Sequence, residues 1–199
     1  ITTYSDKIAK NEARLKLGLP DKHIILYFGI IRQYKGFDIL LKAVASLKEN
    51  MNTFHVLAVG ECYENREKYR GLIDKLDISD CITWHDRYIS DDDVAMYFSA
   101  ADVAALPYRS ASQSGVIPIA YYYNLPVIVT KVGGLPEIVD ADKSGFIIEP
   151  DNPDELANVL AENLGTPIFD KMANYIQSYK QQFSWEDFVE GIEKLYQRI

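Results

Sequence analysis

Six short apolar segments, alternating with stretches of helical periodicity, constrain the fold of this chain more than any other feature. We predict strands at residues 23–29, 53–60, 82–85, 103–106, 127–130 and 145–148. Each segment is apolar on both faces, as expected for strands covered by helices on both sides of a parallel sheet. Alternating strands and helices are typical of such sheets, because their crossover connections are helical.

Helical patterns separate and follow these strands. We predict helices at residues 37–49, 65–76, 91–100 and 114–123 between strands, and at 153–164, 167–182 and 185–198 near the end. A further helix, over residues 5–17, ends at Gly18 and Pro20. Ser90 and Asn152 each stand three positions before an acidic residue, which is typical of a helix start.

No internal repeat or low-complexity linker divides the 199 residues. The prediction is therefore one α/β domain over residues 1–199, with a doubly wound, Rossmann-like, six-stranded parallel sheet and extra C-terminal helices. A hydrophobic fraction of 48% can supply its core and argues against disorder.

The charge pattern excludes some functions. A formal net charge of -8 argues against a nucleic-acid partner, although a local anion site stays possible. The two cysteines, Cys62 and Cys81, lack paired spacing, which favours a reducing compartment. No apolar run approaches the ~20 residues of a membrane-spanning helix. The sequence begins at Ile1 rather than at Met, which hints at a fragment or a processed chain.

Ligands of such sheets bind at the carboxyl ends of the strands. The loop after the first strand reads FGIIRQYKGFD and places Arg32 and Lys35 beside Gly36, where a helix opens. Two cations beside a helix start can hold an anion, and an arginine fork suits phosphate oxygens. The alternative is two solvated loop cations. The loop matches neither a Walker motif nor a GxGxxG fingerprint.

A second loop of this kind follows the fourth predicted strand. Ser112, Gln113, Ser114 and Gly115 lie just ahead of a helical stretch, where small residues let backbone N–H groups face a phosphate. A plain serine-rich turn explains the same residues equally well. Two anion-suited loops after two strands of one sheet could, however, converge on one diphosphate.

At this point the sequence resembles the group 1 (family 4) glycosyltransferases of GT-B architecture, and specifically their C-terminal donor-binding domain. Five segments carry the resemblance, in family order and spacing: FGIIRQYKGFDILLKA, VLAVGE, WHDRYISDDDVAMYFSAADVAALPY, SQSGVIPIAYYYNLPVIV and KVGGLPEIVDADKSGFII. The resemblance implies transfer of a sugar from a nucleotide-diphosphate sugar to an acceptor hydroxyl with retention of configuration, in polysaccharide or glycoconjugate biosynthesis.

The resemblance also implies partners. They are the nucleotide-sugar donor, an acceptor glycan or lipid-linked glycan, and the enzyme's own N-terminal acceptor domain, which is absent from this chain. We therefore expect this domain to be inactive alone. The expected location is cytoplasmic, with peripheral attachment to the inner face of the membrane left open.

Family motifs assign the site residues. The donor diphosphate is expected at Arg32, Lys35, Ser114, Gly115 and Val116. The donor sugar or nucleoside is expected near Arg87, Tyr88, Ile89, Ser112, Gln113 and Ile119. Glu61, after the second strand, could touch a sugar hydroxyl or be a solvated carboxylate. No catalytic residue is assigned.

No metal is expected at the site. His23, His55 and His85 lie far apart without ligand spacing, and two cations with a helix end could replace a metal ion.

Two departures from the family stand out. Many members carry two glutamates with seven residues between them, at the positions where this chain has Ala111 and Ile119, neither of which accepts a hydrogen bond through its side chain. Many also have Arg directly after the glycine, where this chain has Ile30. Because of these departures, the alternative remains that the chain is a non-catalytic nucleotide-sugar-binding module that has lost activity. A glycoside hydrolase with paired carboxylates finds little support, because most acidic residues lie at helix starts or on predicted exposed faces.

Overall fold

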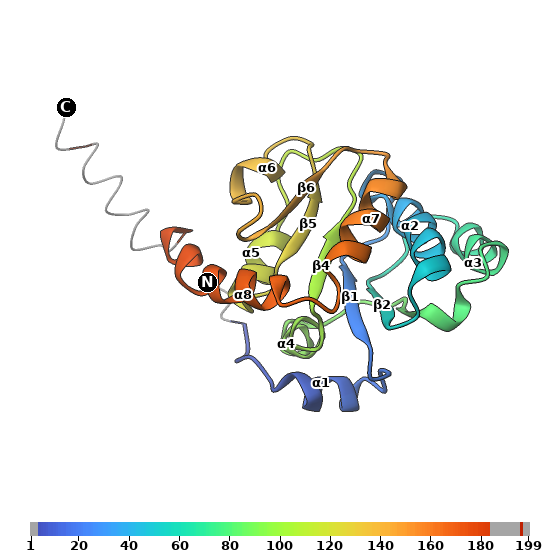
Figure 1. Cartoon of the computed structure of the whole chain (residues 1–199), viewed down its shortest axis with the longest axis horizontal. Coiled ribbons are helices and arrows are strands. Elements are labelled where there is room, and N and C mark those ends of the chain that lie inside the picture. The colour runs from blue at the N-terminus through green and yellow to red at the C-terminus, as the bar shows by residue number, and fades with distance from the viewer. Residues whose placement is uncertain (1–3, 184–195, 197–199) are drawn as a thin grey trace.

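The computed structural model describes residues 4–183 and residue 196. It contains one six-stranded parallel sheet in the order β3-β2-β1-β4-β5-β6, and the predicted doubly wound α/β fold is confirmed (Figure 1). The strands are β1 (His23–Phe28), β2 (Phe54–Val59), β3 (Ile82–His85), β4 (Val103–Leu106), β5 (Val127–Thr130) and β6 (Gly145–Ile148). All six coincide with predicted strands, to within one residue at each end.

Helices cover both faces of this sheet (Figure 1). One face carries α2 (Phe37–Asn50), α3 (Arg66–Lys75) and α7 (Pro153–Asn163), and the other carries α4 (Asp91–Ala100), α5 (Val116–Tyr122) and α6 (Leu135–Ile138). The helix α1 (Lys10–Lys16) packs against α4. The helix α8 (Ile168–Tyr179) reaches both faces, since Met172 packs in one core and Ile176 in the other. Short 3-10 helices are η1 (Gln33–Lys35), η2 (Ser79–Cys81) and η3 (Lys180–Phe183).

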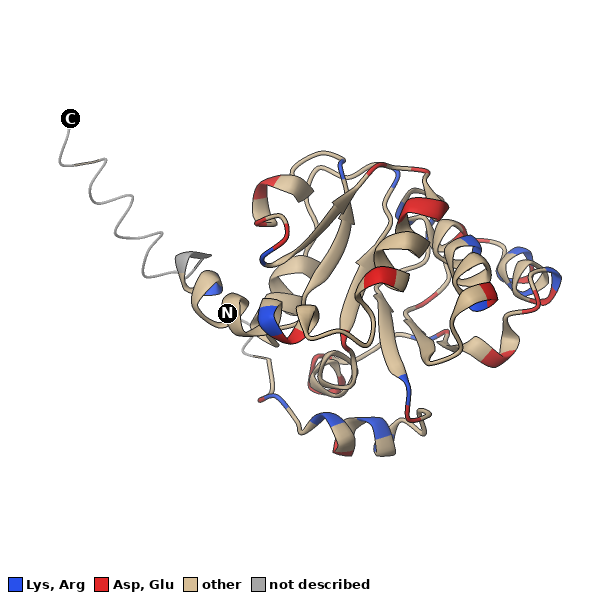
Figure 2. Cartoon of the chain, in the orientation of Figure 1, with Lys and Arg blue, Asp and Glu red and all other residues tan. Residues whose placement is uncertain are grey.

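The strands are buried on both faces, and alternate residues enter different cores. In β1, Ile25 and Tyr27 pack beneath α2 and α7, whereas Ile24 and Leu26 pack beneath α4. This is the period-2 alternation of a strand. None of these six strands contains Lys, Arg, Asp or Glu, and Figure 2 shows the described charges on helices and loops.

The predicted first helix was wrong at its start, because α1 begins at Lys10 rather than near residue 5. Tertiary hydrogen bonds take up the preceding segment instead. The Ile8 N–H donates to Ser99 Oγ at 3.0 Å, and the Tyr123 hydroxyl donates to the Ser5 carbonyl at 2.9 Å. These contacts hold residues 5–8 against α4 and the end of α5.

Other helix predictions differ less. The helix predicted at 114–123 spans only Val116–Tyr122, and that at 167–182 ends at Tyr179 and continues as η3. The sequence did not indicate α6, η1 or η2. Asn152 caps α7 as predicted, since its Oδ1 accepts the Glu155 N–H at 3.1 Å. The helix predicted at 185–198 lies outside the described residues.

The strand order reverses between β1 and β4, so β1 is paired with β2 on one side and with β4 on the other. Crevices at such a reversal, outside the carboxyl ends of the strands, are the usual ligand sites of doubly wound sheets. The loops after β1 and β4 are the two loops with predicted anion sites. Within the described residues, no helix is both long and apolar enough to cross a bilayer.

Candidate functional site

The loops after β1 and β4 meet at Gly29, directly after β1. A Cβ atom built on Gly29 would lie 2.9 Å from Lys35 Nζ and 3.8 Å from Val116 Cγ2. Gly29 has a φ of +112°, which side-chain-bearing residues rarely adopt. The backbone of β1, the Lys35 ammonium and the start of α5 therefore share one small region.

Lys35 presents a cation there without a carboxylate partner among the described residues. Its side chain is half-buried, and its Nζ lies 5.3 Å from the centre of the Tyr108 ring. Burial lowers the pKa of this ammonium, because the charged form loses solvation. An anion placed beside it would restore that lost stabilisation.

Arg32 is placed differently from Lys35. It is exposed, and its guanidinium carbon lies 5.3 Å from the centre of the Tyr63 ring. Arg32 also borders an open cavity of about 420 Å³, whose lining includes Tyr34, Glu64 and Arg109 but not Lys35.

A second cavity, of about 260 Å³, lies at the carboxyl ends of the first three strands. It brings together four of the residues predicted near the donor sugar or nucleoside, which are Glu61, Arg87, Tyr88 and Ile89. Gly29 and Ile30 line the same cavity, so it adjoins the Lys35 region.

Side chains at the rim of this 260 Å³ cavity differ in how firmly they are held. The Arg87 Nη2 donates to the Tyr97 hydroxyl at 3.1 Å, and that hydroxyl also contacts His85 Nδ1 at 3.1 Å. Burial, and then the Arg87 charge, lower the pKa of His85. Tyr88, by contrast, is 74% exposed.

Close backbone contacts join the loops that follow β1, β2 and β4. A Cβ on Gly60 would lie 2.1 Å from the Gly29 carbonyl oxygen, and one on Gly36 would lie 1.9 Å from the Pro107 oxygen. Both glycines have positive φ, +138° and +68°. Only glycine lets the loops after β1, β2 and β4 approach so closely.

The loop before α5, in which a phosphate site is predicted, packs against the loop after β5. The Gly134 N–H donates to the Ser112 carbonyl at 2.9 Å, and a Cβ on Gly133 would lie 1.6 Å from the Ala111 oxygen. Ser114 is buried, and its Oγ accepts the Val116 N–H at 3.3 Å.

The remaining predicted residues of this loop vary in exposure. Ser112, Gln113 and Gly115 are exposed. Ala111 and Ile119, at the positions of the two family glutamates, are half-buried and pack against the apolar core beneath α4 and α5. The structure therefore places no carboxylate from these two positions at the site.

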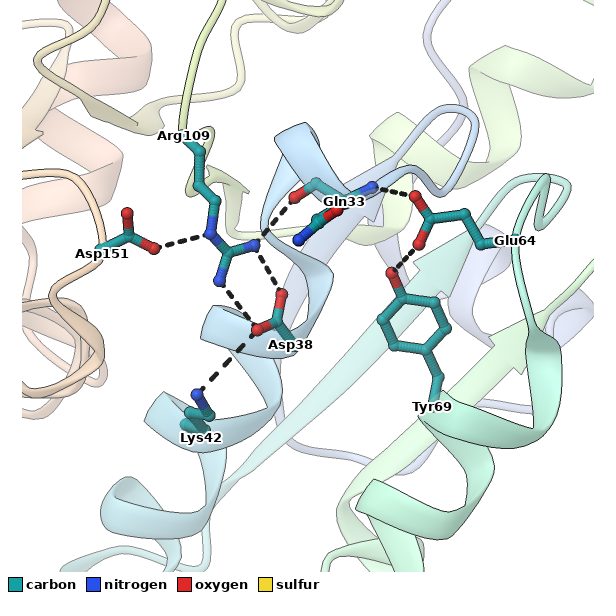
Figure 3. Close-up of polar contacts among 7 residues, drawn as sticks. All are labelled: Gln33, Asp38, Lys42, Glu64, Tyr69, Arg109 and Asp151. Atoms are coloured by element: carbon teal, nitrogen blue, oxygen red, sulfur yellow. Dashed lines mark hydrogen bonds and ion pairs between the residues drawn. The ribbon is translucent and has the colours of Figure 1, made fainter.

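A polar network around Arg109 was missing from the sequence predictions. Arg109 makes a two-pronged ion pair with Asp38 of α2 and also contacts Asp151 and the Gln33 carbonyl (Figure 3). The only local signal was an arginine two residues after Pro107, at the end of a buried strand.

No group of three or more His, Cys, Asp or Glu side chains is placed to hold a metal in the described part of the chain. His55 Nε2 pairs with Thr83 Oγ1 at 2.8 Å, and His85 pairs with Tyr97. Cys62 and Cys81 are both buried free thiols.

Comparison with known proteins places this geometry in a family. The family model described as glycosyl transferases group 1 matches residues 22–165. D-inositol 3-phosphate glycosyltransferase of Corynebacterium jeikeium is 30% identical over 206 residues, covering 100% of this chain and 49% of that protein. The chain thus spans about half the length of the curated relatives it matches.

Solved structures share the fold. Sucrose-phosphate synthase from Thermosynechococcus elongatus superposes with a TM-score of 0.79 at 25% identity, over 96% of this chain and 49% of that one. HepE from Anabaena, solved with UDP and glucose, has a TM-score of 0.79 at 20% identity, over 98% of this chain and 56% of its own. Because the family model covers well over half of the sequence, the chain belongs to the group 1 glycosyltransferases.

Proposed function

We propose that residues 1–199 form the donor-binding, C-terminal half of a GT-B glycosyltransferase. The reaction is transfer of a sugar from a nucleotide-diphosphate sugar to the hydroxyl of a glycan or lipid-linked glycan acceptor, with retention of configuration, in polysaccharide or glycoconjugate synthesis. The acceptor site and part of the catalytic surface belong to an N-terminal domain. The greater length of the relatives supports this division.

One observation carries the proposal. Gly29, Lys35 and Val116 converge at the switch point of the sheet, and the Lys35 ammonium has no carboxylate partner among the described residues. A half-buried, unpaired cation is costly unless it serves an anion. A diphosphate is the anion that suits a cation facing a glycine-lined backbone.

The chemistry of the leaving group follows from this placement. When the glycosidic bond breaks, its electron pair goes to the nucleoside diphosphate, whose negative charge increases. A cation fixed beside the diphosphate oxygen that receives this electron pair stabilises the transition state more than it stabilises the bound donor. This difference is what speeds the reaction. Lys35 is the residue proposed for this role, with Arg32 at the outer phosphate and no metal ion required.

The 260 Å³ cavity is the proposed place for the nucleoside and part of the sugar. It is continuous with Gly29 and lined by Glu61, Arg87, Tyr88 and Ile89. The Anabaena neighbour of the same fold was solved with UDP and glucose, which supports a nucleotide-sugar ligand. Exposed Tyr88 offers a ring on which a base can stack.

A non-catalytic binding module is the second candidate. It is favoured by Ala111 and Ile119, which supply no polar side chain at the positions of the two family glutamates. A full-length protein that binds a nucleotide sugar without turning it over would identify a binding module. The leading proposal requires both binding and turnover in the full-length protein.

The test is calorimetric titration of the full-length protein with UDP, GDP and ADP. We expect one of them to bind, and Lys35→Met to weaken that binding by about tenfold to a hundredfold, as for the loss of a charged hydrogen bond. Lys143→Met is the matched control, since Lys143 is exposed and pairs with Asp140 at 3.3 Å. Unchanged affinity in Lys35→Met would refute the diphosphate assignment, and turnover by the isolated domain would refute the division into halves.

A further inference from the structure

We infer that Arg109 is a positioning residue for the donor diphosphate. It holds the loop that carries Lys35 in the one arrangement in which the ammonium faces Gly29. This inference rests on the proposed function, because it assigns Arg109 a role at the same site. Arg109 acts through the loop rather than by touching the donor.

Five hydrogen bonds join Arg109 to three other parts of the chain, and Figure 3 shows the four that its side chain makes. Its Nη1 and Nη2 each donate to one oxygen of Asp38, both at 2.8 Å, and Nη1 also donates to the Gln33 carbonyl at 2.8 Å. Its Nε donates to Asp151 at 2.6 Å, and its backbone N–H donates to the Tyr34 carbonyl at 2.7 Å. The loop after β4 is thereby fastened to η1, to α2 and to the loop after β6.

A second carboxylate secures η1 from its other side. Glu64 accepts the Gln33 backbone N–H with Oε1, and it accepts the Tyr69 hydroxyl at 2.7 Å with Oε2. The carbonyl and the N–H of Gln33 are therefore both held, one by Arg109 and one by Glu64 (Figure 3). These bonds fix the backbone of η1, from which the Lys35 side chain extends toward Gly29.

Arg109 itself is unsuited to bind a phosphate in this state. Burial tends to raise the pKa of Asp38, but the hydrogen bonds and charge of Arg109 outweigh burial and lower that pKa. Asp38 thus remains ionised and compensates the guanidinium, which also contacts Asp151. A positive group already paired with two carboxylates and a carbonyl offers a further anion little attraction.

The role requires the shape of arginine. The planar fork reaches both oxygens of Asp38 while Nε points to Asp151, and a lysine ammonium cannot make all these bonds at once. Holding a binding group in its bound arrangement removes an ordering cost from ligand binding. Loosening the loop should therefore weaken nucleotide binding even though Lys35 is still present.

The test compares Arg109→Lys with Arg14→Lys in the full-length protein. Arg14 is a matched control, because it also pairs with a carboxylate and a carbonyl, Asp102 at 2.6 Å and Ala100 at 2.9 Å, at the opposite end of the sheet. The ligand is whichever of UDP, GDP or ADP the unaltered protein binds. We expect Arg109→Lys to weaken its affinity about tenfold, within the usual range of coupling energies, and Arg14→Lys to leave it unchanged.

A double variant separates positioning from a general loss of structure. In a Lys35→Met background, Arg109→Lys should cost less than about twofold in affinity, because the group that it positions is gone. Hydrogen exchange of the amides at residues 33–36 should also rise in Arg109→Lys and not in Arg14→Lys. Asp38→Asn, which weakens the same pair, should shift both readouts in the same direction if Arg109→Lys does not fold.

Full affinity in a folded Arg109→Lys variant would overturn the inference. So would equal losses with and without Lys35, since Arg109 would then act independently of it. If the unaltered protein binds none of the three nucleotides, the proposed function fails and this inference fails with it. If Lys35→Met abolishes nucleotide binding and Arg109→Lys retains it, the inference about Arg109 is wrong and the proposed function stands.

Discussion

The contact between Gly36 and Pro107 makes a sharp prediction about how the site is built. Gly36 has a φ of +68°, and a Cβ on it would lie 1.9 Å from the Pro107 carbonyl oxygen. Gly18, which follows α1, has a φ of +63°, and a Cβ there would meet nothing within 4 Å in the described structure. Gly36→Ala and Gly18→Ala should therefore strain the backbone to a similar degree. Only Gly36→Ala also brings its Cβ into collision with a neighbouring atom.

The two costs can be separated. A left-handed conformation costs an alanine about 1 to 2 kcal/mol, and this applies to both variants. The Gly36 collision is far inside the 3.0 Å below which Cβ contacts are essentially absent, and its partner is backbone. Relieving such an overlap typically costs a further ~1 to 3 kcal/mol. Gly36→Ala should thus be less stable than Gly18→Ala by that second amount.

Urea unfolding monitored by tryptophan fluorescence would measure both free energies of unfolding. In the same samples, nucleotide titration should show weaker binding only for Gly36→Ala, because relief of the overlap parts the loops after β1 and β4. Equal destabilisation of the two variants would refute the argument that backbone contact between these loops builds the site.

Other predictions concern the scaffold. Burial lowers the pKa of His55 in the folded protein, so the unfolded state takes up a proton on this residue first as pH falls below about 6.5. The free energy of unfolding should therefore decline as pH falls from 8 to 5. Urea midpoints should show a smaller decline in His55→Val. Tyr123→Phe should cost about 1 kcal/mol by urea unfolding, because it removes the bond to the Ser5 carbonyl, and no loss would contradict that role. Asn152→Ala should cost a similar ~1 kcal/mol through loss of the cap on the Glu155 N–H, and an unchanged melting temperature would argue against it.

The sheet could be predicted because its information is local. A strand buried on both faces must be apolar throughout, so a run such as Val103–Leu106 reveals itself without knowledge of its neighbours. The site at the carboxyl ends follows from the same pattern. Once Lys35 and Val116 are known to follow adjacent strands, the geometry of a parallel sheet brings them together.

Long-range polar contacts were not predictable in this way. Arg109 pairs with Asp38, 71 positions away, and no local pattern identifies one carboxylate among many as its partner. The late start of α1 has the same origin, since Ser99, 91 positions from Ile8, accepts the amide that a longer helix would have used. Tertiary hydrogen bonds there override helix propensity.

The close glycine contacts between the loops after β1, β2 and β4 bear on how readily this protein could be re-engineered. At Gly60 and Gly36 the nearest atoms are the backbone of Gly29 and Pro107, so these contacts offer no side chain to exchange and tolerate almost no added atom. Variation is confined to the rim, where Tyr63 and Tyr88 are 57% and 74% exposed. A library aimed at new ligands for the 260 Å³ cavity should randomise those rim positions and leave the glycines fixed, and its successful members should keep the stability of the parent protein.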